Sequence, residues 1–140
     1  MKTLKLQNVL LAALILLLGL SSNLTAQSNS KLNITNNIYA LDNLKSGINS
    51  ENTGVRKSSI YFAGKYKINE VVNNLIERLE KENEPSVRLL IAYSFYEIND
   101  DEGMKAVKHL SITDKNLKVK SISYSLYKDY VDNLNRTAAL

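Results

Sequence analysis

Apolar and small residues follow one another at the spacing of a helix face through most of this chain. After Val55, one stripe continues with Ser59, Ala63 and Tyr66, which lie four, eight and eleven positions further along. At about 100° per residue, these positions share one side of a helix. The same spacing follows two later valines, in the stripes Val87, Ile91, Phe95 and Ile98, and Val119, Ser123, Tyr127 and Tyr130. Each segment is therefore predicted to be a helix that buries one face.

The three stripes begin at a constant 32-residue interval, each at a valine followed by a basic residue: Val55-Arg56, Val87-Arg88 and Val119-Lys120. Further helical patterns lie before and between them, with apolar residues at Leu41, Leu44 and Ile48, at Val72, Leu75, Ile76 and Leu79, and at Ala106, Val107 and Leu110. Residues typical of helix N-termini agree with these patterns. Pro85 suits a first helical turn, and Asn99 to Glu102 supply an N-cap and acidic residues for the first turn of the next helix. The pattern predicts six helices, near 38–49, 53–66, 69–81, 85–98, 101–111 and 116–132.

The 32-residue period determines the expected architecture. A helical hairpin of this length cannot bury its apolar face alone, so successive copies have to stack and share a core. The fold class predicted is therefore all-α, as a short α-solenoid of antiparallel helix pairs. The repeat domain is expected over residues 38–132, opening on a half repeat, and residues 133–140 are expected to form a C-terminal tail.

The repeated motif resembles the HEAT repeat, especially the short bacterial kind that is also seen in phycobilisome lyases. The resemblance rests on Val55-Arg56 through Phe62-Ala63-Gly64 and Tyr66, and on Val87-Arg88 through Ile98-Asn99-Asp100. The third copy departs from the motif, with Lys128 at the glycine position. This resemblance implies a right-handed superhelix of helix pairs, and it carries over no catalytic residue.

The resemblance also implies a role for the basic residue after each valine. It is expected to pack along its hairpin and to pair with an acid near the preceding turn. The candidate acids are Glu51, Glu82 and Asp114, for Arg56, Arg88 and Lys120 respectively. An anion-binding ladder made by the three basic residues is the alternative.

The N-terminus has the pattern of a secretory signal peptide. Lys2 and Lys5 precede an apolar run from Val9 to Leu20, and small and polar residues follow. Twelve helical residues rise about 18 Å, against about 30 Å of bilayer hydrocarbon, so a retained membrane anchor is the weaker alternative. Cleavage is expected after Ala26 or Gln27, which makes residues 1–27 the signal peptide. The mature protein is then exported to the periplasm or the extracellular space, with no stable membrane span.

The Ser- and Asn-rich residues 28–37 are expected to be a flexible leader. Residues 28–140 carry 16 Lys and Arg against 14 Asp and Glu, because two lysines lie in the predicted signal peptide. This balance gives no basic surface for nucleic acid. The chain has no cysteine, which excludes a disulfide, a thiolate nucleophile and a lipoprotein anchor.

Catalytic and metal-binding motifs do not fit the chain. Gly54 through Gly64-Lys65 has the wrong spacing for a phosphate loop. The acids from Asn99 to Gly103 would put Ile98 at the first calcium-ligand position, so a helix cap is the better interpretation. His109 is the single histidine and has no second imidazole to share a metal. We therefore predict no catalytic residue, no cofactor and no metal site.

Two surfaces are candidates for binding a partner. The second helices should present one polar face on the inner, concave side of the solenoid, formed by Asn73, Asn74, Glu77, Arg78, Lys81, Lys105, Lys108 and His109. The first helices should present an aromatic patch formed by Tyr61, Leu89, Tyr93 and Tyr96. The alternative for the polar face is an ordinary solvated helix surface. The alternative for the aromatic patch is that its rings fill the interfaces between repeats.

The sequence thus predicts a non-enzymatic scaffold or adaptor in a bacterial envelope, binding a protein or an extended peptide. A self-associating assembly module is the first alternative. In that case, the last helix, with Tyr124, Tyr127 and Tyr130, would pack against another copy. A regulatory subunit related to the lyase-type HEAT proteins is the second alternative.

Overall fold

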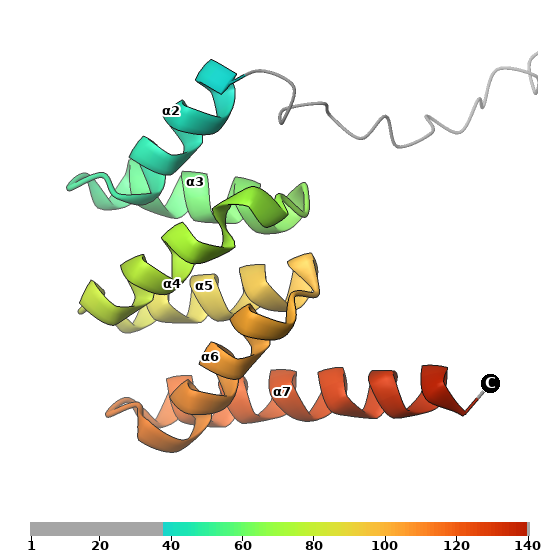
Figure 1. Cartoon of the computed structure of the whole chain (residues 1–140). Helices are drawn as coiled ribbons and strands as arrows, with labels where there is room; N and C mark the ends of the chain where they lie inside the picture. Colours follow the sequence, from blue (N-terminus) through green and yellow to red (C-terminus); the bar gives the residue numbers. More distant parts are fainter. Residues whose placement is uncertain (1–37, 140) are drawn as a thin grey trace, which may run out of the picture. The chain divides into compact units, whose positions relative to one another are not determined.

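The computed structural model describes residues 38–139, which form six α-helices and one short 3₁₀ helix (Figure 1). In chain order the elements are α2 (Ile38–Ile48), α3 (Thr53–Lys65), η2 (Asn69–Val71), α4 (Val72–Lys81), α5 (Pro85–Ile98), α6 (Asp101–Thr113) and α7 (Leu117–Ala138). Residues 38–139 contain no strand, so the all-α prediction is confirmed for them. The predicted signal peptide and leader lie outside the described residues.

The helix boundaries follow the sequence pattern closely, with one clear difference at the end. The last helix continues to Ala138 instead of ending near residue 132, so most of the expected tail is helical. The turns that precede the valine-bearing helices show the repeat directly. Asn52 caps α3 by accepting hydrogen bonds from Gly54 and Val55, and Asn116 caps α7 in the same way. Pro85 opens α5, where its missing N–H is no loss.

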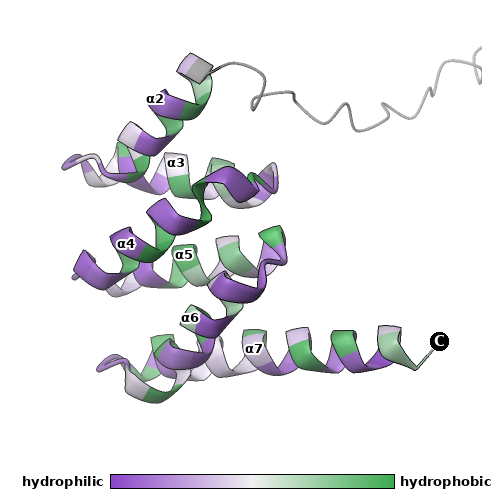
Figure 2. Cartoon of the chain, viewed as in Figure 1, coloured by the Kyte–Doolittle hydropathy of each residue, from purple (hydrophilic) through white to green (hydrophobic). Residues whose placement is uncertain are grey.

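The helices lie in two layers. In one layer α5 lies between α3 and α7 and contacts both (Figure 1). The helices α2, α4 and α6 form the other layer, in which α4 contacts its two neighbours. Contacts between the layers join α2 to α3, α4 to α5, and α6 to both α5 and α7. The faces of α4 and α6 that are turned toward the viewer are mostly hydrophilic (Figure 2).

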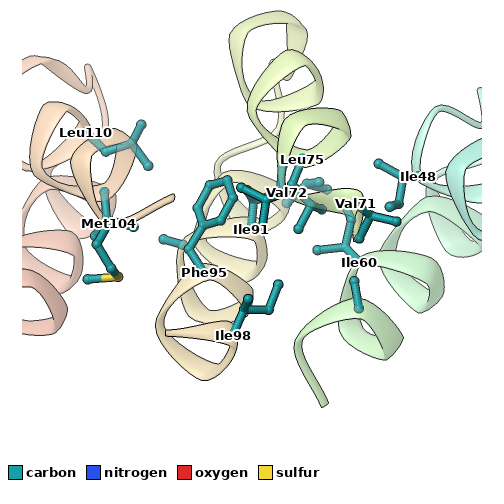
Figure 3. Close-up of a cluster of buried hydrophobic side chains, with 14 of the residues drawn as sticks. Ile48, Ile60, Val71, Val72, Leu75, Ile91, Phe95, Ile98, Met104 and Leu110 are labelled. Carbon is teal, nitrogen blue, oxygen red and sulfur yellow. The ribbon is translucent and has the colours of Figure 1, made fainter. Parts of the chain in front are cut away.

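The core is centred on α5, which has neighbours on three sides. Ile91 and Phe95 are fully buried between Leu75 of α4 and Met104 of α6 (Figure 3). The ring of Phe95 lies so close to Gly103 that a Cβ at this glycine would come within 2.3 Å of it. A glycine is therefore required where α6 crosses the ring.

The valines of the predicted stripes are buried in two copies and exposed in the first, where Ala63 is the fully buried residue of the stripe. Val87 and Val119 are fully buried, whereas the side chain of Val55 is 48% exposed. All three valines occupy the third position of their helix. On α2, a Cβ built at Gly47 would lie 2.1 Å from the Ser59 hydroxyl and 3.9 Å from Val55, so α2 approaches α3 most closely at Ser59.

A close backbone approach joins α3 and α5. A Cβ built on Gly64 would lie 2.8 Å from the Cα of Ser94, closer than real side chains approach. The hydroxyl of Ser94 donates a hydrogen bond to the Ile60 carbonyl at 2.9 Å across the same contact. Small residues at this crossing therefore set the distance between the two helices.

We expect Gly64→Ala to destabilise the protein by about 1–3 kcal/mol, because the added methyl has to push the backbone of Ser94 away. Urea unfolding followed by circular dichroism measures the loss. Gly54→Ala is the matched control, since a Cβ there meets only the Asn52 side chain, at 3.2 Å. Equal stability of the two variants would contradict the close approach.

Candidate functional site

The basic residues that follow the valines connect consecutive turns of the stack. The Arg56 guanidinium donates from Nε to Glu82 at 2.9 Å and from Nη1 to the Ser50 carbonyl at 2.7 Å. Arg88 repeats this arrangement one copy later in the chain. Its Nε and Nη2 donate to the two carboxylate oxygens of Asp114 at 2.7 and 2.8 Å, and its Nη1 donates to the Asn83 carbonyl at 2.9 Å.

Each arginine therefore pairs with the acid of the following turn, not with the acid of the preceding turn as expected. Glu82 and Asp114 do form the ion pairs, but with the arginine one repeat earlier. The carboxylate expected from Glu51 is not used, since only its backbone carbonyl accepts from Arg56. The reason is geometric. The guanidinium donates to backbone carbonyls of the preceding turn, and its remaining N–H groups reach the acid of the next turn.

The turn residues at positions 50, 82 and 114 play one repeated role. The side chains of Ser50, Glu82 and Asp114 each accept a hydrogen bond from the backbone N–H two residues later. Glu82 also accepts from Arg78, which lies on the preceding helix. The three positions follow the same 32-residue period as the valines, and Ser50 is the one that carries no charge.

Both acids of these pairs are almost completely buried, with 3% of each side chain exposed. Burial raises the pKa of Glu82. The hydrogen bond from the N–H of Glu84 and the guanidinium groups of Arg78 and Arg56 together lower it by more, so the pKa lies below its ordinary value. The Arg88 guanidinium lowers the pKa of Asp114 against the opposing effect of burial. Arg56 and Arg88 are thus occupied by internal partners, which favours the structural role over the anion-binding ladder.

The polar face predicted on the second helices lies on α4 and α6, and its eight residues are exposed or half-buried. Several of its charges are engaged within the chain. Arg78 pairs with Glu82 and Lys105 with Glu102, while the Lys108 ammonium lies 5.4 Å from the centre of the Tyr127 ring. This face therefore offers a partner less unpaired positive charge than the sequence suggests.

The predicted aromatic patch divides into two parts. Tyr61 and Tyr93 are 51% and 46% exposed, and they lie together along an apolar groove of about 430 Å³ between α3 and α5. Leu89 and Tyr96 pack against the core instead, and the Tyr96 hydroxyl donates to Asp129 of α7. Tyr96 thus lies at the contact between α5 and α7, whereas Tyr61 and Tyr93 lie on an exposed surface.

Sequence reasoning missed several residues of this groove. Its lining is completed by Gly64, Lys65, Leu90, Ser94 and Glu97. The small residues at Gly64 and Ser94 let the two backbones approach, and the groove lies along that contact. Lys65 lies over the Tyr61 ring, with its ammonium 5.6 Å from the ring centre. The 32-residue separation of Tyr61 and Tyr93 was the available signal that these two rings lie side by side.

The remaining polar candidates have structural explanations. Asp100 caps α6 by accepting from Gly103 at 2.9 Å, as the capping interpretation predicted. His109 is exposed on α6. The Tyr130 hydroxyl donates to Asp101, whose carboxylate raises the pKa of Tyr130 to about 12. Within residues 38–139, no three His, Cys, Asp or Glu side chains gather as metal ligands, and no helix is long and apolar enough to cross a membrane.

Comparison of the chain with family models, with curated proteins and with solved structures finds no match. The arginine pairs, the groove and the exposed faces are therefore the features that bear on function.

Replacing Asp114 with Asn should cost about 3 kcal/mol at pH 7, because Arg88 is left buried without its counter-charge. The folded-state pKa of Asp114 is lowered, so its stabilisation is present above the unfolded pKa and is lost as the pH falls through the folded value. Below about pH 4, the free energy of unfolding should therefore fall less steeply in the variant than in the wild type. Urea unfolding at a series of pH values measures both effects.

The control for this prediction is Glu102→Gln, which removes an ion pair between two largely exposed side chains. The free energy of unfolding should change little in this variant, because water and salt screen the pair. An Asp114→Asn variant as stable as this control would show that the buried pair does not hold the turns together.

Proposed function

We propose that this chain is a non-enzymatic scaffold of the HEAT-repeat type, which binds a protein partner along the groove between α3 and α5. Three features support the repeat architecture. The arginine ion pairs recur with the 32-residue period, the side chains at positions 50, 82 and 114 accept the same backbone hydrogen bond, and the helices lie in two layers. In this proposal the helix pairs are antiparallel and follow one another in a right-handed solenoid.

The observation that carries the binding surface is the exposure of Tyr61 and Tyr93 beside an apolar groove. Tyrosine is enriched at protein–protein interfaces, because its ring buries a large apolar area while its hydroxyl keeps a hydrogen-bond partner. Leu90 contributes an apolar lining, while Lys65 and Glu97 provide one charge of each sign. The groove therefore suits a protein segment that inserts an apolar side chain between the rings and hydrogen bonds to their hydroxyl groups.

The compartment is part of the same proposal. Residues 1–27 have the signal-peptide pattern, and we propose that the mature protein acts in a bacterial envelope compartment. The polar face on α4 and α6 is a second candidate surface, with Lys105 and Lys108 as its exposed cations.

Partner binding should depend on the two groove tyrosines. We expect Tyr61→Ser and Tyr93→Ser each to lower partner recovery from an envelope extract by about tenfold or more, as loss of an aromatic anchor costs at least about 1.4 kcal/mol. Quantitative crosslinking and mass spectrometry measure recovery. The control Ile112→Ser removes an exposed apolar side chain on α6 and should leave recovery unchanged.

Lys105→Glu and Lys108→Glu separate the two surfaces in the same experiment. If recovery falls in these variants and not in the tyrosine variants, the partner binds the face on α4 and α6, and the groove proposal is rejected.

The export proposal predicts a processed chain. The protein isolated from the envelope fraction of the source cells should begin at Gln27 or Ser28, and intact-mass measurement identifies this N-terminus. Recovery of a chain that still contains the apolar run Val9 to Leu20 would support the retained anchor instead.

A further inference from the structure

One side of α3 exposes positions that are buried in the following copies. Val55 and Phe62 are 48% and 46% exposed, and the Phe62 ring stacks on Tyr66 with the ring centres 5.4 Å apart. The equivalent positions in α5, one repeat later, are Val87 and Ser94, which are buried. In α5, Ser94 meets the preceding helix α3 directly. We call the exposed residues Val55 and Phe62, with the partly buried Tyr66, the α3 end.

The far side of α7 shows the complementary situation. Tyr124 is 60% exposed, whereas its equivalents Ile60 in α3 and Ala92 in α5 are fully buried. A shallow hollow of about 230 Å³ lies beside it, lined by Tyr124, Tyr127, Lys128, Val131 and Asp132. We call the apolar residues Tyr124, Tyr127 and Val131 the α7 end.

The order of the layers makes the two ends fit each other. In residues 38–139, α3 is followed by α4 and α5 by α6, which belong to the second layer. The series begins with a second-layer helix, α2, and finishes with a first-layer helix, α7. A second copy that adds its α2 after α7 would complete one more helix pair.

We propose that the α7 end of one copy binds the α3 end of a second copy, continuing the stacking of the repeats from chain to chain. In this arrangement Tyr124 takes the place of Ile60 and Ala92, and it packs against Phe62 of the next copy. Such an interface joins two different surfaces, so it forms a ring or an open chain and not a symmetric pair. A second copy is the occupant because these two faces correspond to the two sides of one contact that is buried within the chain: Phe62 corresponds to Ser94, and Tyr124 to Ile60, and Ser94 packs against Ile60.

The polar positions at this interface are poorly matched, which gives the proposal a sharp test. Lys120 takes the position of Arg56 and Arg88, but the acid position of the next copy is the uncharged Ser50. Lys128 takes the position of Tyr96, which donates to Asp129 within the chain. In the next copy, the residue at the position that corresponds to Asp129 is Lys65, so two positive charges meet. The association is therefore weak in the wild type, and one substitution at either position should strengthen it.

The first experiment uses sedimentation velocity on the full chain, over a range of concentrations. The wild type should associate reversibly, whereas Phe62→Asp and Tyr124→Asp should each be monomeric. A mixture of the two variants should form a one-to-one complex, because one intact α7 end and one intact α3 end remain. Both substituted side chains are about half exposed, so the variants should fold, and circular dichroism checks this.

Several outcomes would overturn the proposal. A wild type that stays monomeric at every concentration would show that the ends are covered in another way, for example by residues 1–37. Association that persists in both variants would place the contact elsewhere. Loss of association in Tyr124→Asp alone would indicate a symmetric contact through α7.

The second experiment strengthens the contact instead of breaking it. Ser50→Glu restores an acid for Lys120, and Lys128→Glu replaces the repulsion from Lys65 with an attraction, so each should tighten association by about tenfold. Asn73→Glu adds the same charge on α4, away from both ends, and should have no such effect. Equal affinity in Ser50→Glu, Lys128→Glu and Asn73→Glu would reject the proposed register.

Discussion

The stack depends on a buried guanidinium that binds two consecutive turns at once. Arg56 and Arg88 donate backward to carbonyls of one turn and forward to the acid of the next. Breaking a buried ion pair is costly even where its net contribution is small, because the remaining charge stays desolvated. Each arginine therefore links two turns that come one repeat apart, and the sequence separation between arginine and acid is the same in both pairs.

The apolar contacts obey the same register, and it determines which surfaces are open to a partner. Small residues occur where backbones or rings come close, as at Gly64 against Ser94, and such contacts leave little freedom because buried side chains pack at the density of a solid. The outer faces of α3 and α7 have no such neighbour among the described helices, so their rings are exposed. Together with the groove between α3 and α5, they are the apolar surfaces on which the proposed protein contacts are placed.

Much of the fold could be predicted because local signals repeat. The helical periodicity, the caps at Asn52 and Asn116, and Pro85 at a helix start identify the helices to within a few residues at most boundaries. The extension of α7 to Ala138 was missed because residues 132–139 are exposed, and an exposed segment has no apolar stripe to reveal a helix. These features depend on residues that are close together in the chain.

The sequence by itself determined the helices, their 32-residue period and the absence of a disulfide. Only the tertiary structure decided that Arg88 pairs with Asp114, that Val55 is exposed while Val87 is buried, and that Tyr61 borders a groove while Tyr96 fills an interface. The physical reason is common to all three. Periodicity specifies which face of a helix a residue occupies, whereas the neighbour on that face comes from another repeat and depends on how the repeats stack.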